Sequence, residues 1–463
     1  MTIRLYNTLS RSVEEFVPLE PGKVRFYSCG PTVYFDAHVG NMRAYVNADL
    51  IKRMFLASGF EVKHIINITD VGHLTDDADA GEDKMEKGSR REGKSAWDIA
   101  KFYTEAFMRD MDDLNILPPT EYTKATDFIK EQIALVVKLE ELGYTYKIEG
   151  DGIYYDVSKF PGYEKLGRQS LDEIKAGARI GENEGKRHPA DFALWKFSRP
   201  GEKRQMEWDS PWGKGFPGWH IECSAMSIAR LGDRIDIHSG GVDHIKIHHS
   251  NEIAQSEPIL GHKWVNYWVH GEFLNDTTGK MSKSSGEFLT LSALKKRGYR
   301  PIEYRYFLLL ASYRTMMEFS FGALSAAAAA YKNLVKRVAS LGSSAGGDAG
   351  EWGRRMLEAA ENDLGTAEAV AVLHEFLKDP GTDDKTKLAA VKFADYLLGL
   401  TLIEDAKALN VKIDGDLQKL IDARAGAKAA KDYAKADAIR AEIEAMGYVL
   451  EDGKDGVKIT RKV

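Results

Sequence analysis

Short apolar runs and helical repeats alternate along the first 115 residues of the chain. Residues 24–27 form an extended apolar run that stops before Gly30, and residues 42–57 then carry apolar positions at helical spacing. Residues 61–68 (EVKHIINI) are apolar and rich in β-branched side chains, which is typical of a buried parallel strand. Residues 97–114 again have helical spacing. This strand–helix–strand–helix order predicts an α/β protein with a parallel sheet.

The α/β pattern breaks at Pro118-Pro119 and resumes after Trp212. Between these points lie a helical segment at 126–142 and short aromatic strands such as FALWKF, which indicate an insertion. The resumed part predicts a helix that carries Cys223, a strand that ends at His238, and a helix that begins near His248. The glycine-punctuated, highly charged stretch at 73–95 predicts a surface loop.

The last third of the chain has a different character. Residues 304–341 and 351–409 are rich in alanine and leucine and predict a helical bundle, joined by the flexible segment GSSAGGDAG. A helix pair and a small hairpin follow from about Val411. The predicted units are residues 1–117, 118–205, 206–268, 269–315, 316–410 and 411–463.

Composition narrows the class of protein. The chain has 463 residues, of which 43% are hydrophobic and 29% are charged, as in an ordinary globular protein. A net charge of −6 argues against a protein coated in nucleic acid, but it allows a local basic groove. No apolar run approaches a membrane span and the N-terminus has no secretory apolar region, so we expect a cytoplasmic protein with no membrane contact. In that compartment the two cysteines are either buried or act as ligands.

The turn after the first strand has the features of a phosphate site. Cys29 and Gly30 lie at the break, and His38 and Gly40 open the following helix. Unpaired N–H groups and the positive end of the helix dipole favour phosphate at such a position. A histidine after a turn is, however, more often an ordinary surface or packed residue.

A second set of residues suggests a metal site. His248 and Glu252 are four residues apart and therefore lie on one face of a helix. With a pair of thiolates from elsewhere in the chain they would form a mixed sulfur, nitrogen and oxygen set suited to zinc. A plain surface pair is the alternative. His249 and Asn251 are expected to point elsewhere.

Two further segments carry candidate binding groups. Thr69 and Asp70 follow a buried strand, where open α/β sheets bind ligands, although a helix cap is an equally good interpretation. Residues 279–288 (GKMSKSSGEF) combine lysines and serines in a glycine-flanked loop, which has the composition of a phosphate clamp. A solvated charged loop is the alternative.

Three separated motifs agree with one another: Cys-Gly-Pro-Thr followed by His-Val-Gly-Asn, then Gly-Trp-His-Ile-Glu-Cys-Ser, and finally Lys-Met-Ser-Lys-Ser. With them the chain resembles the class I aminoacyl-tRNA synthetases, and among these the cysteinyl-tRNA synthetases, over nearly its whole length. Asn41 stands where the first signature of the class ends in histidine, and it can still donate a hydrogen bond. The C-terminus, GVKITRKV, lacks a tryptophan that is often seen there.

The resemblance implies a fold and a set of site residues. The fold is a Rossmann-like parallel-sheet catalytic domain split by a connective insertion, then a stem-contact segment, an α-helical bundle and a small α+β anticodon-binding domain. The catalytic and ATP-binding positions fall on His38, Gly40, Asn41, Gly240, Gly241, Asp243, Lys280 and Lys283. The cysteine-binding positions fall on Gly30, Thr32, Thr69, Trp219 and His238, the zinc ligands on Cys29, Cys223, His248 and Glu252, and the RNA contacts on Lys428, Tyr433, Asp437 and Asp452.

The implied reaction joins L-cysteine to tRNA(Cys) through a cysteinyl-adenylate, with one zinc ion per chain and ATP bound with Mg²⁺. A monomer is expected. Two rival interpretations remain. One is a tRNA-independent ligase that joins cysteine to an amino sugar, which should lack the small terminal domain. The other is a non-catalytic zinc-bearing RNA-binding protein, which the intact lysines of the last motif disfavour.

Overall fold

A computed structural model describes residues 2–73, 83–177, 185–198, 201, 204–276, 279–280, 289–342, 347–409, 415–430, 432–453 and 456–461. Two N-terminal strands, β1 (Arg4–Asn7) and β2 (Ser12–Glu15), form a hairpin beside the main sheet. No helix in these ranges combines the length and the apolarity that a membrane span needs.

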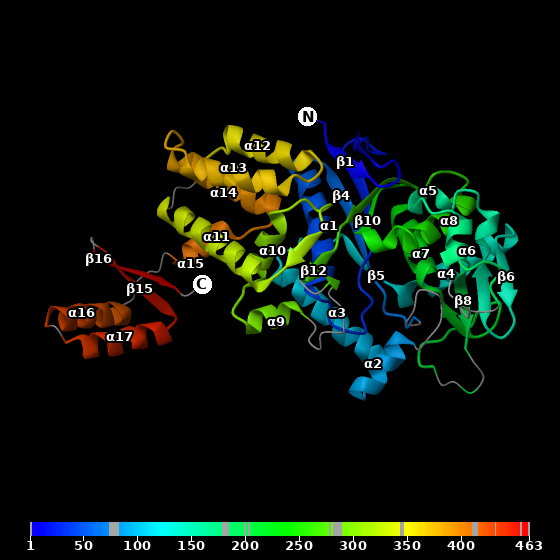
Figure 1. The fold of residues 1–463 in the computed structure, drawn as a ribbon, viewed down its shortest axis with the longest axis horizontal. Helices are drawn as coiled ribbons and strands as arrows, with labels where there is room; N and C mark the ends of the chain where they lie inside the picture. Colours follow the sequence, from blue (N-terminus) through cyan, green and yellow to red (C-terminus); the bar gives the residue numbers. More distant parts are fainter. Residues whose placement is uncertain are drawn as a thin grey trace.

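The centre of the molecule is a parallel sheet of five strands (Figure 1). Its order is β11-β10-β3-β4-β5, and every neighbouring pair is parallel. The chain fills one half outward from β3 and the other half outward from β10, which is the doubly wound order of Rossmann-like folds. The predicted α/β parallel sheet is confirmed. The strands are β3 (Lys23–Ser28), β4 (Glu61–Ile68), β5 (Glu121–Lys124), β10 (Ile235–Gly241) and β11 (Val265–Gly271).

Helices connect and cover the strands of this sheet. The predicted segments at 42–57, 97–114 and from His248 are all helical, as α1, α3 and α8. The loop predicted over residues 73–95 is wrong for its second half: Asp83 caps a helix there and Gly93 ends it in a left-handed conformation. The helices are α1 (Val39–Ala57), α2 (Lys84–Glu92), α3 (Ala96–Asp113), α7 (Trp219–Leu231) and α8 (His248–Leu260), with the turn η3 (Val242–His244).

The insertion forms its own antiparallel sheet, β6-β7-β8-β9, at the right of Figure 1. The insertion was predicted to span residues 118–205. Strand β9 of its sheet lies beyond residue 205, whereas strand β5, which lies within the predicted range, belongs to the central sheet. The elements are η1 (Ala125–Phe128), α4 (Ile129–Glu141), β6 (Thr145–Ile148), β7 (Gly152–Tyr155), η2 (Val157–Lys159), α5 (Glu164–Gly167), α6 (Leu171–Gly177), β8 (Phe192–Phe197) and β9 (Gly215–Pro217).

A small sheet, β13-β12-β14, and a set of helices follow the second half of the central sheet. The region 304–341, predicted to be helical, is interrupted by β14, which pairs with β12. The elements are β12 (Leu274–Asp276), β13 (Gly279–Lys280), α9 (Leu291–Lys296), α10 (Pro301–Leu309), β14 (Met317–Phe319), α11 (Phe321–Ser340), α12 (Gly350–Glu361), α13 (Thr366–Lys378), α14 (Asp384–Leu398) and α15 (Leu402–Leu409).

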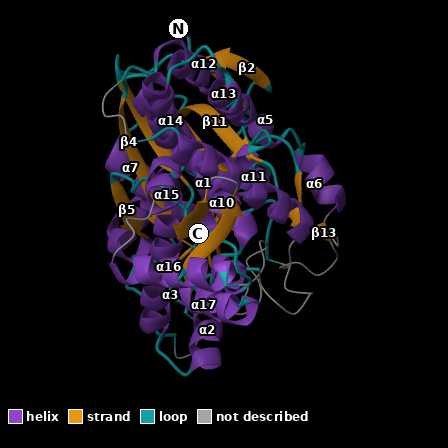
Figure 2. Cartoon of the chain, turned by 90° about the vertical axis from the view of Figure 1, so that its left-hand side faces the viewer, coloured by secondary structure: helices purple, strands orange, loops and turns teal. Residues whose placement is uncertain are grey.

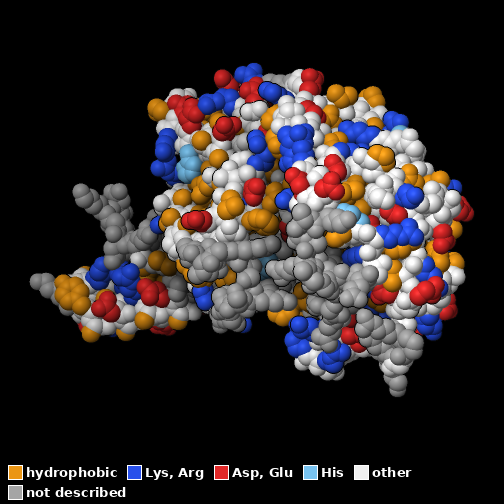
Figure 3. Space-filling view, turned by 45° about the vertical axis from the view of Figure 1, so that its right-hand side comes forward, with side chains coloured by type: hydrophobic (Ala, Val, Ile, Leu, Met, Phe, Trp, Pro, Cys, Tyr) orange, Lys and Arg blue, Asp and Glu red, His pale blue; other side chains and the backbone are white. Residues whose placement is uncertain are grey.

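The C-terminal module has a small core of its own, built on Leu417, Ile443 and Leu450. It consists of α16 (Gly415–Ala429), α17 (Tyr433–Ala445) and the hairpin of β15 (Tyr448–Gly453) and β16 (Gly456–Arg461). In Figure 2 its helices lie in front of the rest of the chain, and Figure 3 shows it projecting from the main body with basic and acidic side chains on its surface. The predicted helix pair and hairpin are confirmed.

A buried ion pair joins the helical bundle to the catalytic sheet. Asp49 of α1 pairs with Arg305 of α10, and the Nε of Arg53 lies 2.7 Å from the same carboxylate. Arg305 has no exposed surface and also donates to the carbonyl oxygens of Leu398 and Leu114, at 2.8 and 3.0 Å. Because this guanidinium links α1, α3 and α14, it fixes the helix that carries the first sequence motif against the bundle.

We expect Arg305→Met to destabilise the protein by about 3 kcal/mol or more, because it leaves buried acceptors without their donor. Urea unfolding, followed by circular dichroism, measures the loss. The matched control is Arg355→Met, which removes an exposed pair with Glu375 and should leave the unfolding midpoint unchanged. Equal midpoints for the two variants would show that the Arg305 pair does not hold the bundle in place.

Candidate active site and metal centre

A cavity of about 570 Å³ opens at the carboxyl ends of β3 and β10, where the strand order of the sheet reverses. Ligands bind at this point in open α/β sheets because the loops on its two sides diverge. Most of the site residues implied by the sequence resemblance line this cavity. They are Cys29, Gly30, Thr32, His38, Gly40, Asn41, Thr69, Trp219, Cys223, Gly240, Gly241, Asp243 and His248.

The N-terminus of α1 forms one wall of the cavity. His38 caps the helix: its Nδ1 accepts a hydrogen bond from the Asn41 backbone at 3.2 Å, and the Asn41 side chain accepts from the His38 backbone at 3.3 Å. A Cβ on Gly40 would lie 2.9 Å from His38 Nδ1, so glycine keeps the backbone open there. The helix therefore presents backbone N–H groups and its positive dipole end to the cavity.

The segment with Lys-Met-Ser-Lys-Ser begins and ends close to this wall. Lys280 ends β13, and Val39 donates a backbone hydrogen bond to the carbonyl of Leu289 at 2.8 Å. Lys283 and the side chain of Lys280 lie outside the described residues.

The hydroxyl of Thr69 is held by groups that the sequence did not single out. It donates to Glu222 Oε2 at 3.0 Å and accepts from Asn67 Nδ2 at 3.1 Å. Glu222 is fully buried, and its other oxygen lies 2.7 Å from His73 Nε2. Burial raises the pKa of Glu222 well above its ordinary value. The only sequence signal for this network was the polar content of an otherwise apolar helix, α7.

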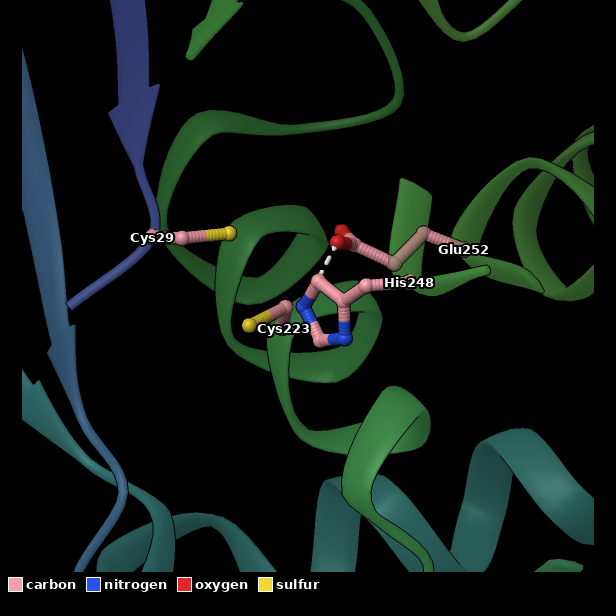
Figure 4. A group of neighbouring side chains, drawn as sticks. All are labelled: Cys29, Cys223, His248 and Glu252. Atoms are coloured by element: carbon pink, nitrogen blue, oxygen red, sulfur yellow. Dashed lines mark ion pairs between the residues drawn. The ribbon is translucent and has the colours of Figure 1, made fainter. Parts of the chain in front are cut away.

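The side chains of Cys29, Cys223, His248 and Glu252 converge on one another (Figure 4). Their donor atoms all lie within 4.8 Å of one another, although they come from the end of β3, from α7 and from α8. Glu252 Oε1 is 3.0 Å from His248 Nε2, yet it is buried and accepts no well-formed hydrogen bond among the described residues. Two sulfurs, a nitrogen and a carboxylate oxygen form a donor set that suits zinc, so the residues present fit this ion.

A second donor set overlaps the first. Cys29 and Glu252 also converge with His238 and His249 within the same 4.8 Å limit. The expectation that His249 points elsewhere is wrong: its Nε2 lies 3.2 Å from Cys29 Sγ. The prediction considered only the spacing of residues along α8. His248 and His249 are the first two residues of this helix, and both can reach a group that lies beyond the helix N-terminus. Asn251 does point away, and it accepts from the Tyr163 hydroxyl at 2.7 Å.

The first set is the one that faces the cavity. Cys223 and His248 line it, whereas His238 and His249 do not. The structure thus places His238, predicted to bind cysteine, behind the wall, where its Nε2 lies 2.9 Å from Glu252 Oε2. His220 Nδ1 lies 2.9 Å from the Nδ1 of His248 and so orients the other ring nitrogen toward Glu252.

The ionisable side chains of this cluster shift one another's pKa values. Burial raises the pKa of Cys29 well above its ordinary value, and a hydrogen bond with Cys29 lowers the pKa of Cys223 to about 7. Burial alone would raise the pKa of Glu252, but His238 and His248 lower it to about 2. Burial likewise opposes the charge on His248, whereas Glu252 and Cys223 raise its pKa to about 10. The protein thus holds a buried carboxylate that its neighbours keep charged.

The sequence model of the family "tRNA synthetases class I (C) catalytic domain" matches residues 15–329, and that of the "cysteinyl-tRNA ligase anticodon binding domain" matches residues 411–459. The chain is 48% identical to cysteine–tRNA ligase 1 of Burkholderia lata, over 99% of this chain and 97% of that protein. The chain belongs to the cysteinyl-tRNA synthetase family. It is also 44% identical to the cysteine–tRNA ligase of Treponema denticola, over 98% of each.

A solved structure supports the fold. Methionyl-tRNA synthetase of Mycobacterium tuberculosis, in complex with methionyl-adenylate, superposes with a TM-score of 0.58 at 14% identity, over 84% of this chain and 94% of that one.

The residues predicted to contact RNA lie in the small C-terminal module. Lys428 is near the end of α16, Tyr433 and Asp437 are on α17 with Tyr433 exposed, and Asp452 is in β15 with its side chain outside the described residues.

Gly30 offers a direct test of this geometry. A Cβ at Gly30 would lie 1.6 Å from the carbonyl oxygen of Asn67, so the ends of β3 and β4 approach too closely for any other residue. We expect Gly30→Ala to separate Cys29 from Thr69 and to reduce amino-acid activation at least 100-fold, because misplacement of about 1 Å costs that much. The assay is isotope exchange between pyrophosphate and ATP.

The control is Gly426→Ala in α16, where an added Cβ meets nothing within 4 Å. Its exchange rate should match that of the wild type. Full activity in Gly30→Ala would mean that the close approach of the strands does not position the site.

Proposed function

We propose that this chain, a cysteine–tRNA ligase, activates L-cysteine with ATP in the cavity between β3 and β10, selects it through a zinc ion on Cys29, Cys223, His248 and Glu252, and transfers it to tRNA(Cys). The observation that carries the proposal is the position of the metal cluster. Three of its four residues line the same cavity as the N-terminus of α1. A thiol-selective group and a phosphate-binding helix end therefore share one space.

Selection is the step for which the cluster is needed. Serine differs from cysteine by one atom and is no larger, so a pocket built from shape alone would separate them poorly. When bound, zinc supplies a soft Lewis acid that prefers a thiolate to a hydroxyl. The chain's own residues orient the rest of the substrate. Trp219 packs against His248 with ring centroids 4.6 Å apart, and Thr69, whose hydroxyl is held by Glu222 and Asn67, lines the same cavity.

The nucleotide occupies the other side of the cavity in this proposal. Gly40 offers a helix N-terminal N–H group to the phosphates, and Asn41 offers its side-chain amide. Gly240 and Gly241 border the cavity at the end of β10, followed by Asp243. Lys280 and Lys283 neutralise the charge that develops on the α-phosphate as the cysteine carboxylate attacks it and pyrophosphate leaves. Mg²⁺ accompanies ATP.

The C-terminal module bears on which molecule accepts the activated cysteine. The match of residues 411–459 to an anticodon-binding domain favours tRNA as acceptor over an amino sugar, since the rival ligase should lack this domain. With it, Lys428, Tyr433, Asp437 and Asp452 are proposed to contact the anticodon region. We also propose a monomer that acts in the cytoplasm.

The test of the function is pyrophosphate exchange with each of the twenty amino acids, followed by charging of bulk tRNA. We expect exchange with cysteine above all others, and cysteine attached to one tRNA species. Exchange with another amino acid, or cysteine activation without tRNA charging, would overturn the proposal.

Replacement of one sulfur ligand tests the selection step. We expect Cys223→Ser to lower the bound zinc and to reduce the ratio of cysteine to serine activation by about 100-fold, because the metal set loses a soft donor. The metal is measured by mass spectrometry and the ratio by exchange. The control is Ser227→Ala, one turn further along α7, which should keep both. Strong discrimination that persists in metal-free protein would contradict the zinc account.

Removal of the C-terminal module tests its role. We expect a chain that ends at Leu409 to activate cysteine normally and to charge tRNA poorly, because the module has its own core. Residues 416–463 carry ten basic and nine acidic side chains, so the module must contribute specific contacts more than bulk attraction to phosphate. Equal charging by the shortened and the full chain would contradict the assignment.

A further inference from the structure

One cavity residue has no place in the sequence motifs. Lys84 begins α2, in a stretch whose charge pattern predicted only a surface loop. The described residues that line the cavity include three carboxylates, Asp36, Asp243 and Glu272, but Lys84 is their only lysine or arginine. An anionic group that enters the cavity on the side away from the metal ligands therefore meets one lysine and no arginine among these residues.

The ammonium of Lys84 lies against two aromatic rings. Its Nζ is 5.6 Å from the ring centroid of Trp219 and 6.0 Å from that of Tyr34. Among the described residues it has no hydrogen-bond or ion-pair partner. Cation–π attraction is weak compared with an ion pair, so the charge of Lys84 remains available to a ligand.

The backbone around Lys84 is fixed from several directions. Its N–H donates to the carbonyl of His73 at 2.8 Å, and Asp83 caps α2 by accepting from the next two backbone N–H groups. Arg204, from the end of the insertion, forms a buried ion pair with Asp83 and donates to the carbonyl of Gly72. A Cβ at Gly72 would lie 2.2 Å from Asp83 Oδ1, so the two segments are in close contact.

Hydrogen bonds also connect this segment to Thr69, which lines the cavity. His73 contacts Glu222, which also holds the hydroxyl of Thr69. Lys84 is thereby connected to the part of the cavity formed by Thr69 and Trp219. The carboxyl carbon of cysteine is only three bonds from its sulfur, so an amino acid held at the metal cluster must carry its carboxylate close to Trp219.

We propose that Lys84 binds the α-carboxylate of the amino-acid substrate. The assignment rests on the proposed function, since it takes the substrate to be cysteine held by its sulfur. Lys84 neutralises the carboxylate against the three acidic groups of the cavity and orients it for attack on the α-phosphate of ATP.

The experiment compares two ligands, L-cysteine and cysteamine, which has the same thiol and amine but no carboxylate. Calorimetric titration of the zinc-loaded protein, without ATP, gives the affinity of each. We expect Lys84→Met to weaken L-cysteine about 10- to 100-fold and to change cysteamine less than about twofold, because only the first ligand loses a charge-assisted contact. Lys84→Arg, which keeps the charge, should recover most of the affinity.

Lys87→Met is the matched control, because Lys87 is exposed on the same helix and does not line the cavity. It should bind both ligands as the wild type does. In exchange assays Lys84→Met should raise the KM for cysteine and leave the KM for ATP unchanged.

Equal weakening of cysteine and cysteamine would overturn the inference, since it would indicate a structural role for Lys84. Unchanged affinity for cysteine, or an effect confined to ATP, would overturn it as well. These results leave the proposed function standing as long as the wild type activates cysteine. A wild-type protein that binds neither thiol would overturn the proposed function together with the inference.

Discussion

The site depends on one buried charge, the carboxylate of Glu252. This side chain has no exposed surface, and a carboxylate so placed is unfavourable unless partners compensate it. His248 contacts one of its oxygens and His238 the other, and together they lower its pKa to about 2. A cation at the neighbouring thiols would complete the compensation. The donor set is therefore a means of holding a buried charge as well as a binding site.

The topology of the sheet makes this arrangement possible. Cys29 follows β3, and His238 lies in β10, the neighbouring parallel strand. Cys223 comes from the helix α7, and α8 follows β10. Because the strand order reverses between β3 and β10, the loops above them diverge and leave the cavity into which the cluster opens. The N-terminus of α1 reaches the same cavity because α1 follows β3, and the buried Arg305–Asp49 pair holds α1 in place.

The sequence was most informative where local patterns decide the structure. The boundaries of β4 and the start of α8 were predicted to the residue, since their apolar spacing and flanking residues are strong signals. Most of the site residues that the family resemblance implied also line the cavity. Local patterns failed where distant segments decide. The cap on α2 depends on Arg204, and the contact of His249 with Cys29 joins two halves of the sheet. Lys84 could not be found because its charged neighbours resemble any solvated segment.

The central claim is that two sulfurs, from Cys29 and Cys223, hold the metal at the cavity. The competing set, with His238 and His249, has only one sulfur. X-ray absorption at the zinc edge counts sulfur ligands directly. The account predicts two sulfurs in the zinc-loaded protein and a third after addition of L-cysteine, with no change after addition of L-serine. A single sulfur in the protein alone, or a spectrum that cysteine leaves unchanged, would contradict it.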